Sequence, residues 1–240
     1  MSDAFYLACR EFSVGIVRIG ARLYCDGMEH VPRTGPALLL SNHISHFDPP
    51  CMMAKFPRIT HFMADKPLLE IPILGKMLHG CHVFPIDRTK NDRSALRTAI
   101  ARVEAGHIVG IFPERGIRHG ATATINGAEL PIGTASLWRM LNVPVIPMII
   151  IGGDQLYARK NWRWPRKVRV CVRVGAPLPP DKNASREELR DRIATSWRDI
   201  FASMQRDYQF RPEELPQSAH QRWGVPEPKP KSETESPAEK

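Results

Sequence analysis

The sequence lacks the patterns that mark several classes of protein. Its five cysteines are scattered, and none forms a Cys-x-x-Cys pair. An odd and dispersed set of cysteines argues against a disulfide framework or a zinc ribbon and fits a reducing compartment. There is also no Gly-x-Ser-x-Gly motif, so the chain offers no nucleophile of the serine-hydrolase type.

Long hydrophobic runs are absent as well. The longest apolar stretch, residues 142–153, contains two prolines and is far shorter than the roughly 20 residues that span a bilayer. Near the start of the chain, Arg10 and Glu11 interrupt an apolar stretch of about six residues, below the roughly 7–15 of a signal-peptide core. The sequence therefore predicts neither a transmembrane helix nor a secretory signal.

Positive charge is what the chain has in excess. Lysine and arginine number 34 against 25 acidic residues, giving a formal net charge of +9. This balance favours an anionic partner, which could be a nucleic acid, a phospholipid surface or a phosphorylated substrate. In residues 157–167, Tyr157, Trp162 and Trp164 alternate with five cations. That segment is open to three interpretations: membrane contact, an ordinary basic loop or a nucleic-acid patch.

Short apolar runs alternate with helical patterns through most of the chain. The pattern predicts an α/β fold with a mixed, largely buried sheet flanked by helices, built on a single core. Strands are expected at residues 36–41, 59–64, 81–86, 107–113, 143–151 and 168–174. Helices are expected at residues 67–79, 92–105, 132–142 and 185–206.

Both ends of the chain differ from this pattern. Residues 4–24 place Phe5, Phe12, Ile16, Ile19 and Leu23 on one stripe of an amphipathic helix. The helix either packs against the core or lies flat in a membrane interface. The last thirty residues are rich in Pro, Glu, Lys and Ser. We therefore expect an N-terminal helical segment (1–26), a catalytic domain (27–208) and a disordered tail (209–240).

The stretch SNHISHFDPP, residues 41–50, follows a predicted strand and concentrates polar chemistry. His43 and Asp48 lie in a turn, where the chain can fold back so that Asp48 caps the next helix and accepts a hydrogen bond from the imidazole. The same spacing recurs at His82 and Asp87, but there a strand would send the two side chains to opposite faces. Geometry therefore favours the first pair.

A carboxylate on one ring nitrogen leaves the other nitrogen free as a general base. Because no protein nucleophile is evident, such a base would activate a hydroxyl group of the substrate. The competing interpretation makes His43, His46 and Asp48 the ligands of a metal-dependent hydrolase, although no further ligand cluster follows in the sequence. A third is a non-catalytic basic protein that binds nucleic acid or membrane.

Three further blocks follow in order, each at the end of a predicted strand. They are HVFPIDR (82–88), GIFPERGIR (110–118) and VPVIPM (143–148). Strand ends at one rim of an α/β sheet are where ligands bind. Arginines beside a glycine suit an anion that approaches the backbone closely.

Together these blocks resemble the glycerolipid acyltransferases of the 1-acylglycerol-3-phosphate type, the His-x4-Asp acyltransferases. The likeness covers about residues 15–205. It implies a glycerol-3-phosphate acyltransferase-like fold in which His43 is the general base and Asp48 orients it. It also implies that the residues that bind the substrate are Asn42, Arg88, Glu114, Arg115, Gly116 and Arg118.

The resemblance further implies an acyl-CoA or acyl carrier protein donor and a lysophospholipid acceptor. The reaction would take place at the cytoplasmic face of a membrane, with the enzyme peripheral or monotopic. No metal, cofactor or nucleic acid is expected, and His46 falls at a variable position. The third block departs from the usual Phe-Pro-Glu-Gly-Thr-Arg-Ser, since Arg115 and Gly116 replace Gly-Thr and the arginine comes one place later, at Arg118. Lysophosphatidate or another lysolipid could therefore be the acceptor.

Overall fold

The computed structural model describes residues 3–89, 92–162, 167–218 and 221. They form one seven-stranded sheet with the order β1-β7-β6-β2-β5-β3-β4. All neighbouring strands are parallel except β6 and β7, so the sheet is mixed, as predicted. The strands are β1 (Ala21–Asp26), β2 (Ala37–Ser41), β3 (Thr60–Asp65), β4 (Phe84–Ile86), β5 (Ile108–Ile111), β6 (Val145–Ile151) and β7 (Val168–Val174).

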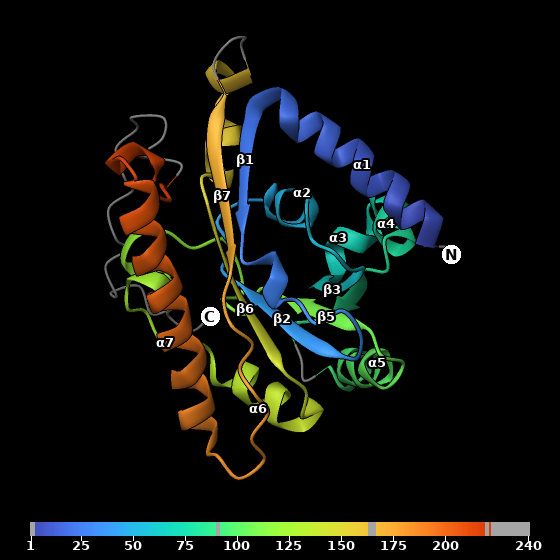
Figure 1. Ribbon diagram of the computed structural model, residues 1–240. Coiled ribbons are helices and arrows are strands. Elements are labelled where there is room, and N and C mark those ends of the chain that lie inside the picture. Colours follow the sequence, from blue (N-terminus) through green and yellow to red (C-terminus); the bar gives the residue numbers. More distant parts are fainter. Residues whose placement is uncertain (1–2, 90–91, 163–166, 219–220, 222–240) are drawn as a thin grey trace, which may run out of the picture.

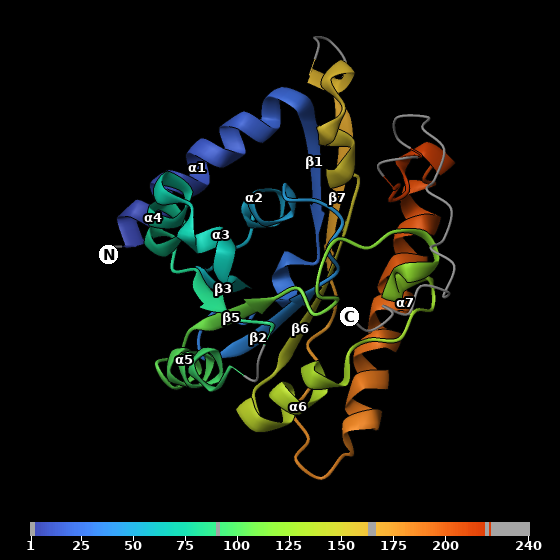
Figure 2. The ribbon, with the colours of Figure 1, turned by 180° about the vertical axis from the view of Figure 1, so that it is seen from behind.

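Helices cover both faces of the sheet (Figure 1). The view from behind shows α1 to α4 on one side, with α6 and α7 on the other (Figure 2). The helices are α1 (Asp3–Gly20), α2 (Asp48–Met53), α3 (Lys66–Glu70), α4 (Pro72–Gly80), α5 (Arg93–Glu104), α6 (Ile132–Leu141) and α7 (Arg186–Tyr208). Every residue of β2 and β6 is buried, which is why both strands read as continuous apolar runs.

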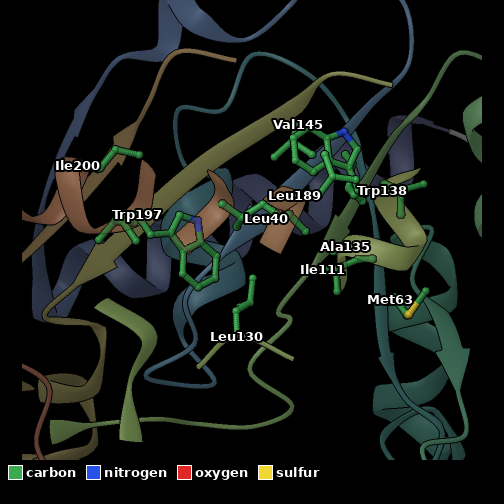
Figure 3. Close-up of a cluster of buried hydrophobic side chains, with 14 of the residues drawn as sticks. Leu40, Met63, Ile111, Leu130, Ala135, Trp138, Val145, Leu189, Trp197 and Ile200 are labelled. Atoms are coloured by element: carbon green, nitrogen blue, oxygen red, sulfur yellow. The ribbon is translucent and has the colours of Figure 1, made fainter. Parts of the chain in front are cut away.

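The core is divided by the sheet into two layers. In the layer under α6 and α7, Trp138 and Trp197 are the largest fully buried side chains, and Figure 3 shows them with Leu40 and Val145 of the sheet. The other layer joins α1 and α2 to the opposite face of the same strands. The strand β2 is therefore held on both sides, which gives the residues that follow it a rigid base.

Most predicted elements are present, and two were assigned wrongly. The helix expected over residues 4–24 ends at Gly20, and residues 21–26 form β1 at the edge of the sheet. A β-carbon at Gly20 would lie 3.0 Å from Leu156 and 3.1 Å from Trp162, so the chain turns there in close contact with the loop after β6. The helix expected over residues 67–79 is divided into α3 and α4, because Ile71 precedes Pro72 and takes an extended conformation.

The apolar stripe of α1 faces away from the core. Tyr6, Val14 and Val17 pack inward, whereas Phe12 is 71% exposed and Ile19 is 62% exposed. Phe5 and Ile16, the other helical members of the predicted stripe, are exposed too. The helix therefore packs against the core, as one of the two interpretations expected, but with a face other than the predicted stripe. None of the helices in the described part of the chain has the length and apolarity needed to cross a membrane.

The domain continues beyond the predicted boundary at residue 208. Arg169 of β7 forms an ion pair with Glu214, and Ser218 is buried. Phe210 and Leu215 pack against the core layer under α7. The tail therefore starts later than residue 209, and its expected disorder over residues 222–240 lies outside the described residues.

Candidate active site

The predicted catalytic turn, residues 42–48 and called the catalytic turn below, connects β2 to α2. The Nδ1 atom of His43 lies 2.8 Å from Oδ2 of Asp48, so the two side chains predicted to interact do so. Asp48 does not cap α2 with its side chain as expected, because it is the first residue of the helix and Phe47 occupies the N-cap position. Its carboxylate instead points back into the turn.

The Asp48 carboxylate is fully buried, and Oδ2 accepts all of its hydrogen bonds. Besides the imidazole, the backbone N–H groups of Ile44 and Ser45 donate to it at 2.7 and 2.9 Å. Burial raises the pKa of Asp48, and the hydrogen bonds from His43 and the two backbone groups oppose that rise. Because Oδ2 already accepts two N–H groups, the shared hydrogen belongs to the imidazole. Nδ1–H therefore donates, and Nε2 is the nitrogen available to a substrate.

The plane of the His43 ring is fixed by an aromatic side chain. Phe112 stacks on the imidazole with a centroid distance of 4.3 Å and an angle of 25°. Phe62 stacks in turn on Phe112 at 5.6 Å. The His43 side chain is 18% exposed, so it is held in place and still open to a ligand.

Glu114, predicted to bind the substrate, is buried and holds the backbone of the turn. Its Oε2 accepts the N–H of His43 at 3.1 Å, and its Oε1 accepts the N–H of Thr124 at 2.7 Å. Burial raises the pKa of Glu114, and these two hydrogen bonds oppose the rise. In this geometry the carboxylate positions the backbone of His43 and does not line the cavity described below.

Asn42, also predicted to bind the substrate, has a similar structural role. Its amide donates to the carbonyl of Ile150 at 3.0 Å and accepts the N–H of the same residue at 2.8 Å. Asn42 is 1% exposed. It therefore connects the end of β2 to β6, and its side-chain amide is hydrogen-bonded to the backbone of Ile150.

The arginines of the second and third blocks surround the turn in different ways. Arg88 pairs with Asp65 and lines the same cavity as His43, which confirms that the two lie at one rim. Gly116 lines that cavity too. Arg115 is exposed and has a left-handed φ of 60°. Arg118 donates its backbone N–H to the carbonyl of His43 at 2.8 Å, so it braces the turn from the outside.

The cavity has a volume of about 780 Å³ and a largely apolar wall. This volume lies in the ~300–1,000 Å³ range of small-molecule sites. Phe62 and Met63 of β3, Leu68 of α3 and Leu74 and Leu78 of α4 contribute to the lining. On the side of α1, the lining residues are Cys9, Arg10 and Ser13. The imidazole thus meets a space suited to a long apolar group.

His46, which the sequence resemblance placed at a variable position, has defined contacts in the structure. It lines the cavity beside His43, with the ring centroids 6.4 Å apart, and its backbone N–H donates to the hydroxyl of Tyr157 at 2.9 Å. Its ring nitrogen Nδ1 contacts the same hydroxyl. His43, His46 and Asp48 therefore do not converge on one point, and nowhere in the described part of the chain do three His, Cys, Asp or Glu residues form a group that could hold a metal ion.

His82, from the second His/Asp pair with the same spacing, has different surroundings from His43. His82 precedes β4 in a turn, with a left-handed φ of 61°, and its Nε2 lies 3.1 Å from Asp3 of α1. It is therefore outside the strand in which the sequence placed it. Its ring stacks on His61 and does not line the cavity.

In the basic segment 157–167, two aromatic rings pack against the domain. Trp162 donates its indole N–H to the carbonyl of Leu156 at 2.8 Å, and the rings of Tyr157 and Trp162 both contact Phe47. Trp164 lies outside the described residues. The packing of Tyr157 and Trp162 favours the ordinary-loop interpretation for these two side chains.

The structure thus places an imidazole, oriented by a carboxylate, at the edge of an apolar cavity on a seven-stranded mixed sheet, which is the arrangement expected of an α/β acyltransferase of the His-x4-Asp class. The comparisons with known proteins agree. A sequence profile of the family described as Acyltransferase matches residues 22–151. The chain belongs to the Acyltransferase family and is an acyl-transferring enzyme.

Its relatives share one activity in their names. A 1-acyl-sn-glycerol-3-phosphate acyltransferase of Bacillus subtilis is 26% identical over 166 residues, which cover 68% of this chain and 75% of the relative. The mouse 1-acyl-sn-glycerol-3-phosphate acyltransferase alpha is 28% identical over 192 residues, which cover 75% of this chain and 65% of the relative. The crystal structure of the 1-acyl-sn-glycerophosphate (LPA) acyltransferase PlsC from Thermotoga maritima has the same fold. It superimposes with a TM-score of 0.60 at 20% identity, covering 80% of this chain and 81% of that one.

Proposed function

We propose that this enzyme transfers a fatty acyl group from an acyl thioester to the hydroxyl group of a lysophospholipid. The donor is acyl-CoA or acyl carrier protein. The first candidate for the acceptor is 1-acylglycerol-3-phosphate, which would give phosphatidic acid. The observation that carries the proposal is the His43–Asp48 pair at the wall of an apolar cavity that also contains Arg88. The names of the relatives support the same acceptor.

The chemistry needs one base and one proton carrier. Nε2 of His43 takes the proton of the acceptor hydroxyl as that oxygen attacks the thioester carbonyl carbon. The carbon–sulfur bond of the resulting tetrahedral intermediate then breaks, and the imidazolium returns the proton to the leaving thiolate. Asp48 stabilises the imidazolium through the hydrogen bond at Nδ1. No acyl-enzyme intermediate is required.

Charge and shape support an anionic lipid as the acceptor. The cavity wall is mainly apolar, and Arg10 and Arg88 are the arginines among its lining residues. A guanidinium group binds phosphate oxygens in a bidentate manner, so Arg88 suits the phosphate of the headgroup if it exchanges Asp65 for the substrate. Since Arg115 and Gly116 alter the usual third block, a lysolipid with another headgroup is the second candidate.

We also propose that the enzyme acts at the cytoplasmic face of a membrane, and its exposed apolar side chains support the membrane contact. Phe12 and Ile19 on α1 are largely exposed, and Ile73 on α4 is 86% exposed. Both helices also contribute to the cavity wall, so a chain entering from the lipid would meet apolar surface throughout. The enzyme would then be peripheral or monotopic.

The direct experiment offers the purified enzyme a mixture of lysolipids with either acyl-CoA or acyl carrier protein, and identifies the products by mass spectrometry. His43→Ala and Asp48→Ala are expected to lower the rate of acyl transfer by about 10²–10⁴-fold, the usual contribution of a general base. His82→Ala is the matched control, since it removes the other histidine with the same spacing and should leave the rate unchanged. Full activity in either variant of the pair would refute the proposal.

A further inference from the structure

The segment that follows β6 packs against the catalytic turn. In the 3₁₀ helix η4 (Gly153–Tyr157), the hydroxyl of Tyr157 accepts the backbone N–H of His46 at 2.9 Å. Three residues before the start of η4, both backbone groups of Ile150 in β6 are hydrogen-bonded to the side chain of Asn42. Between these two contacts, Gly153 faces the carboxylate of Asp48.

Gly153 has no room for a side chain. A β-carbon built on it would lie 2.7 Å from Oδ1 of Asp48, closer than real β-carbons approach other atoms. The next nearest atom is the β-carbon of Ser45 at 3.6 Å, an ordinary contact. The φ angle of Gly153 is outside the left-handed region, so an alanine would be opposed by the carboxylate alone and not by backbone strain.

The carboxylate has little freedom to move away. Asp48 is fully buried, and its Oδ2 is held by the imidazole and two backbone N–H groups. Oδ1 accepts no hydrogen bond from any residue in the described part of the chain. Rotating the group away from residue 153 would therefore disturb the contacts of Oδ2 that orient His43.

We propose that Gly153 is a positioning residue for acyl transfer, which sets the orientation of Asp48 and through it the tautomer and angle of the His43 base. This inference rests on the proposed function for its kinetic consequences and on geometry alone for its structural ones. Gly153 touches no reacting atom. It acts by leaving a space that the carboxylate of Asp48 occupies.

The kinetic test uses Gly153→Ala. We expect kcat to fall by about 10²-fold, the loss that a displacement of ~1 Å causes at a reacting group, with KM for both substrates unchanged. In the His43→Ala background the same substitution should lower the residual rate no further, because its effect passes through the imidazole. A wild-type kcat, or an equal fold-loss in both backgrounds, would overturn the proposal.

The structural test is a double-mutant cycle measured by denaturant unfolding without substrate, so it does not depend on the proposed activity. Gly153→Ala should lower the unfolding midpoint in the native background and leave it unchanged in Asp48→Ala, which lacks Oδ1. Asp48→Ser is a second background, because it also removes Oδ1 and keeps one oxygen as a hydrogen-bond acceptor. Gly15→Ala is the control for a substitution into open space, since nothing lies within 4 Å of that position, and it should raise the midpoint slightly because alanine favours the helix α1.

The cycle gives a clear decision even if Gly153→Ala alone does not fold. In that case folding should return when Asp48 is also replaced by alanine or serine. An equal loss of stability with and without the Asp48 carboxylate would show that residue 153 serves only the backbone, and would overturn the inference.

Discussion

Two buried polar side chains around the catalytic turn, Asn42 and Glu114, form hydrogen bonds with backbone groups. Asn42 and Glu114 belong to the sequence blocks that suggested substrate contact, yet both hold main chain in place. A sequence motif identifies the residue type at a position, but it does not show what the side chain contacts. Which way the side chain points depends on strands that are distant in the sequence, here β6 for Asn42.

Asn42→Ala should therefore weaken the fold as well as the activity. It would leave both backbone groups of Ile150 without partners in a buried site, at a cost of about 1–3 kcal/mol for each. The measurement is the free energy of unfolding in urea. Asn183→Ala, at an exposed position, is the control and should stay within about 0.5 kcal/mol of the native protein. A native-like free energy of unfolding for Asn42→Ala would show that the two hydrogen bonds between Asn42 and Ile150 do not stabilise the fold.

His61 gives the protein a dependence of stability on pH. Its side chain is 2% exposed and stacks between His82 and His107, at 4.7 and 4.2 Å. Burial, followed by repulsion from His107 and His82, lowers the pKa of His61 to about 3. Between that value and the ordinary one of about 6.5, the unfolded chain binds a proton that the folded chain does not.

Stability should therefore fall as pH decreases from about 6.5, by at most about 1.4 kcal/mol per pH unit from this group. Comparing native protein and His61→Gln by urea unfolding between about pH 4 and pH 7 isolates the contribution. The raised pKa values of Asp48 and Glu114 act in the opposite direction, but they are common to both proteins. The variant should show a flatter pH dependence, and parallel curves would rule out a role for His61.

At the scale of elements, α1 combines an inward and an outward function. One face packs on the sheet and lines the cavity with Cys9 and Ser13, and the other leaves Phe12 and Ile19 exposed. Under the proposed function, the exposed stripe is the part of α1 that would contact the membrane. The periodicity of the sequence correctly identified these stripe residues, but it did not show which of two faces the core uses.

Replacing Phe12 and Ile19 of α1 by asparagine should reduce binding to phospholipid vesicles at least ~10-fold, because each side chain would lose a burial worth about 1.5–3 kcal/mol. Co-sedimentation with vesicles measures this directly. Met140→Asn removes an exposed apolar side chain on α6, across the sheet, and should bind as the native protein does. Equal binding by the α1 variant would remove α1 from the interface.

At the scale of the whole molecule, the formal net charge of +9 favours binding to an anionic surface. Cations at a membrane surface are attracted by anionic lipid over about one Debye length, near 10 Å at 0.1 M salt. We expect tighter binding to vesicles that contain phosphatidic acid than to purely zwitterionic ones. Raising the ionic strength from about 0.05 to 0.5 M should remove most of that difference. If the difference persists at high salt, the preference for anionic lipid has another cause.

Local sequence was sufficient for much of this protein. Continuous apolar runs identified β2, β5 and β6, since central strands are buried on both faces. The pairing of His43 with Asp48 was also predictable, because a short turn can bring two side chains five positions apart within hydrogen-bonding distance. The helix expected over residues 185–206 is α7, and in the structure Ser185 and Glu188 form a capping box at its start.

Only the tertiary structure decided the rest. Residues 21–26 become β1 because β7, almost 150 positions away along the chain, offers an edge with which to pair. Gly153 contacts the carboxylate of Asp48, 105 positions earlier in the sequence, because it follows β6 at the end of the sheet where the catalytic turn lies. Such contacts arise where strands meet, and no local pattern encodes them. The sequence by itself determined the chemistry that the enzyme carries, and the packing of the sheet decided which side chains hold that chemistry in place.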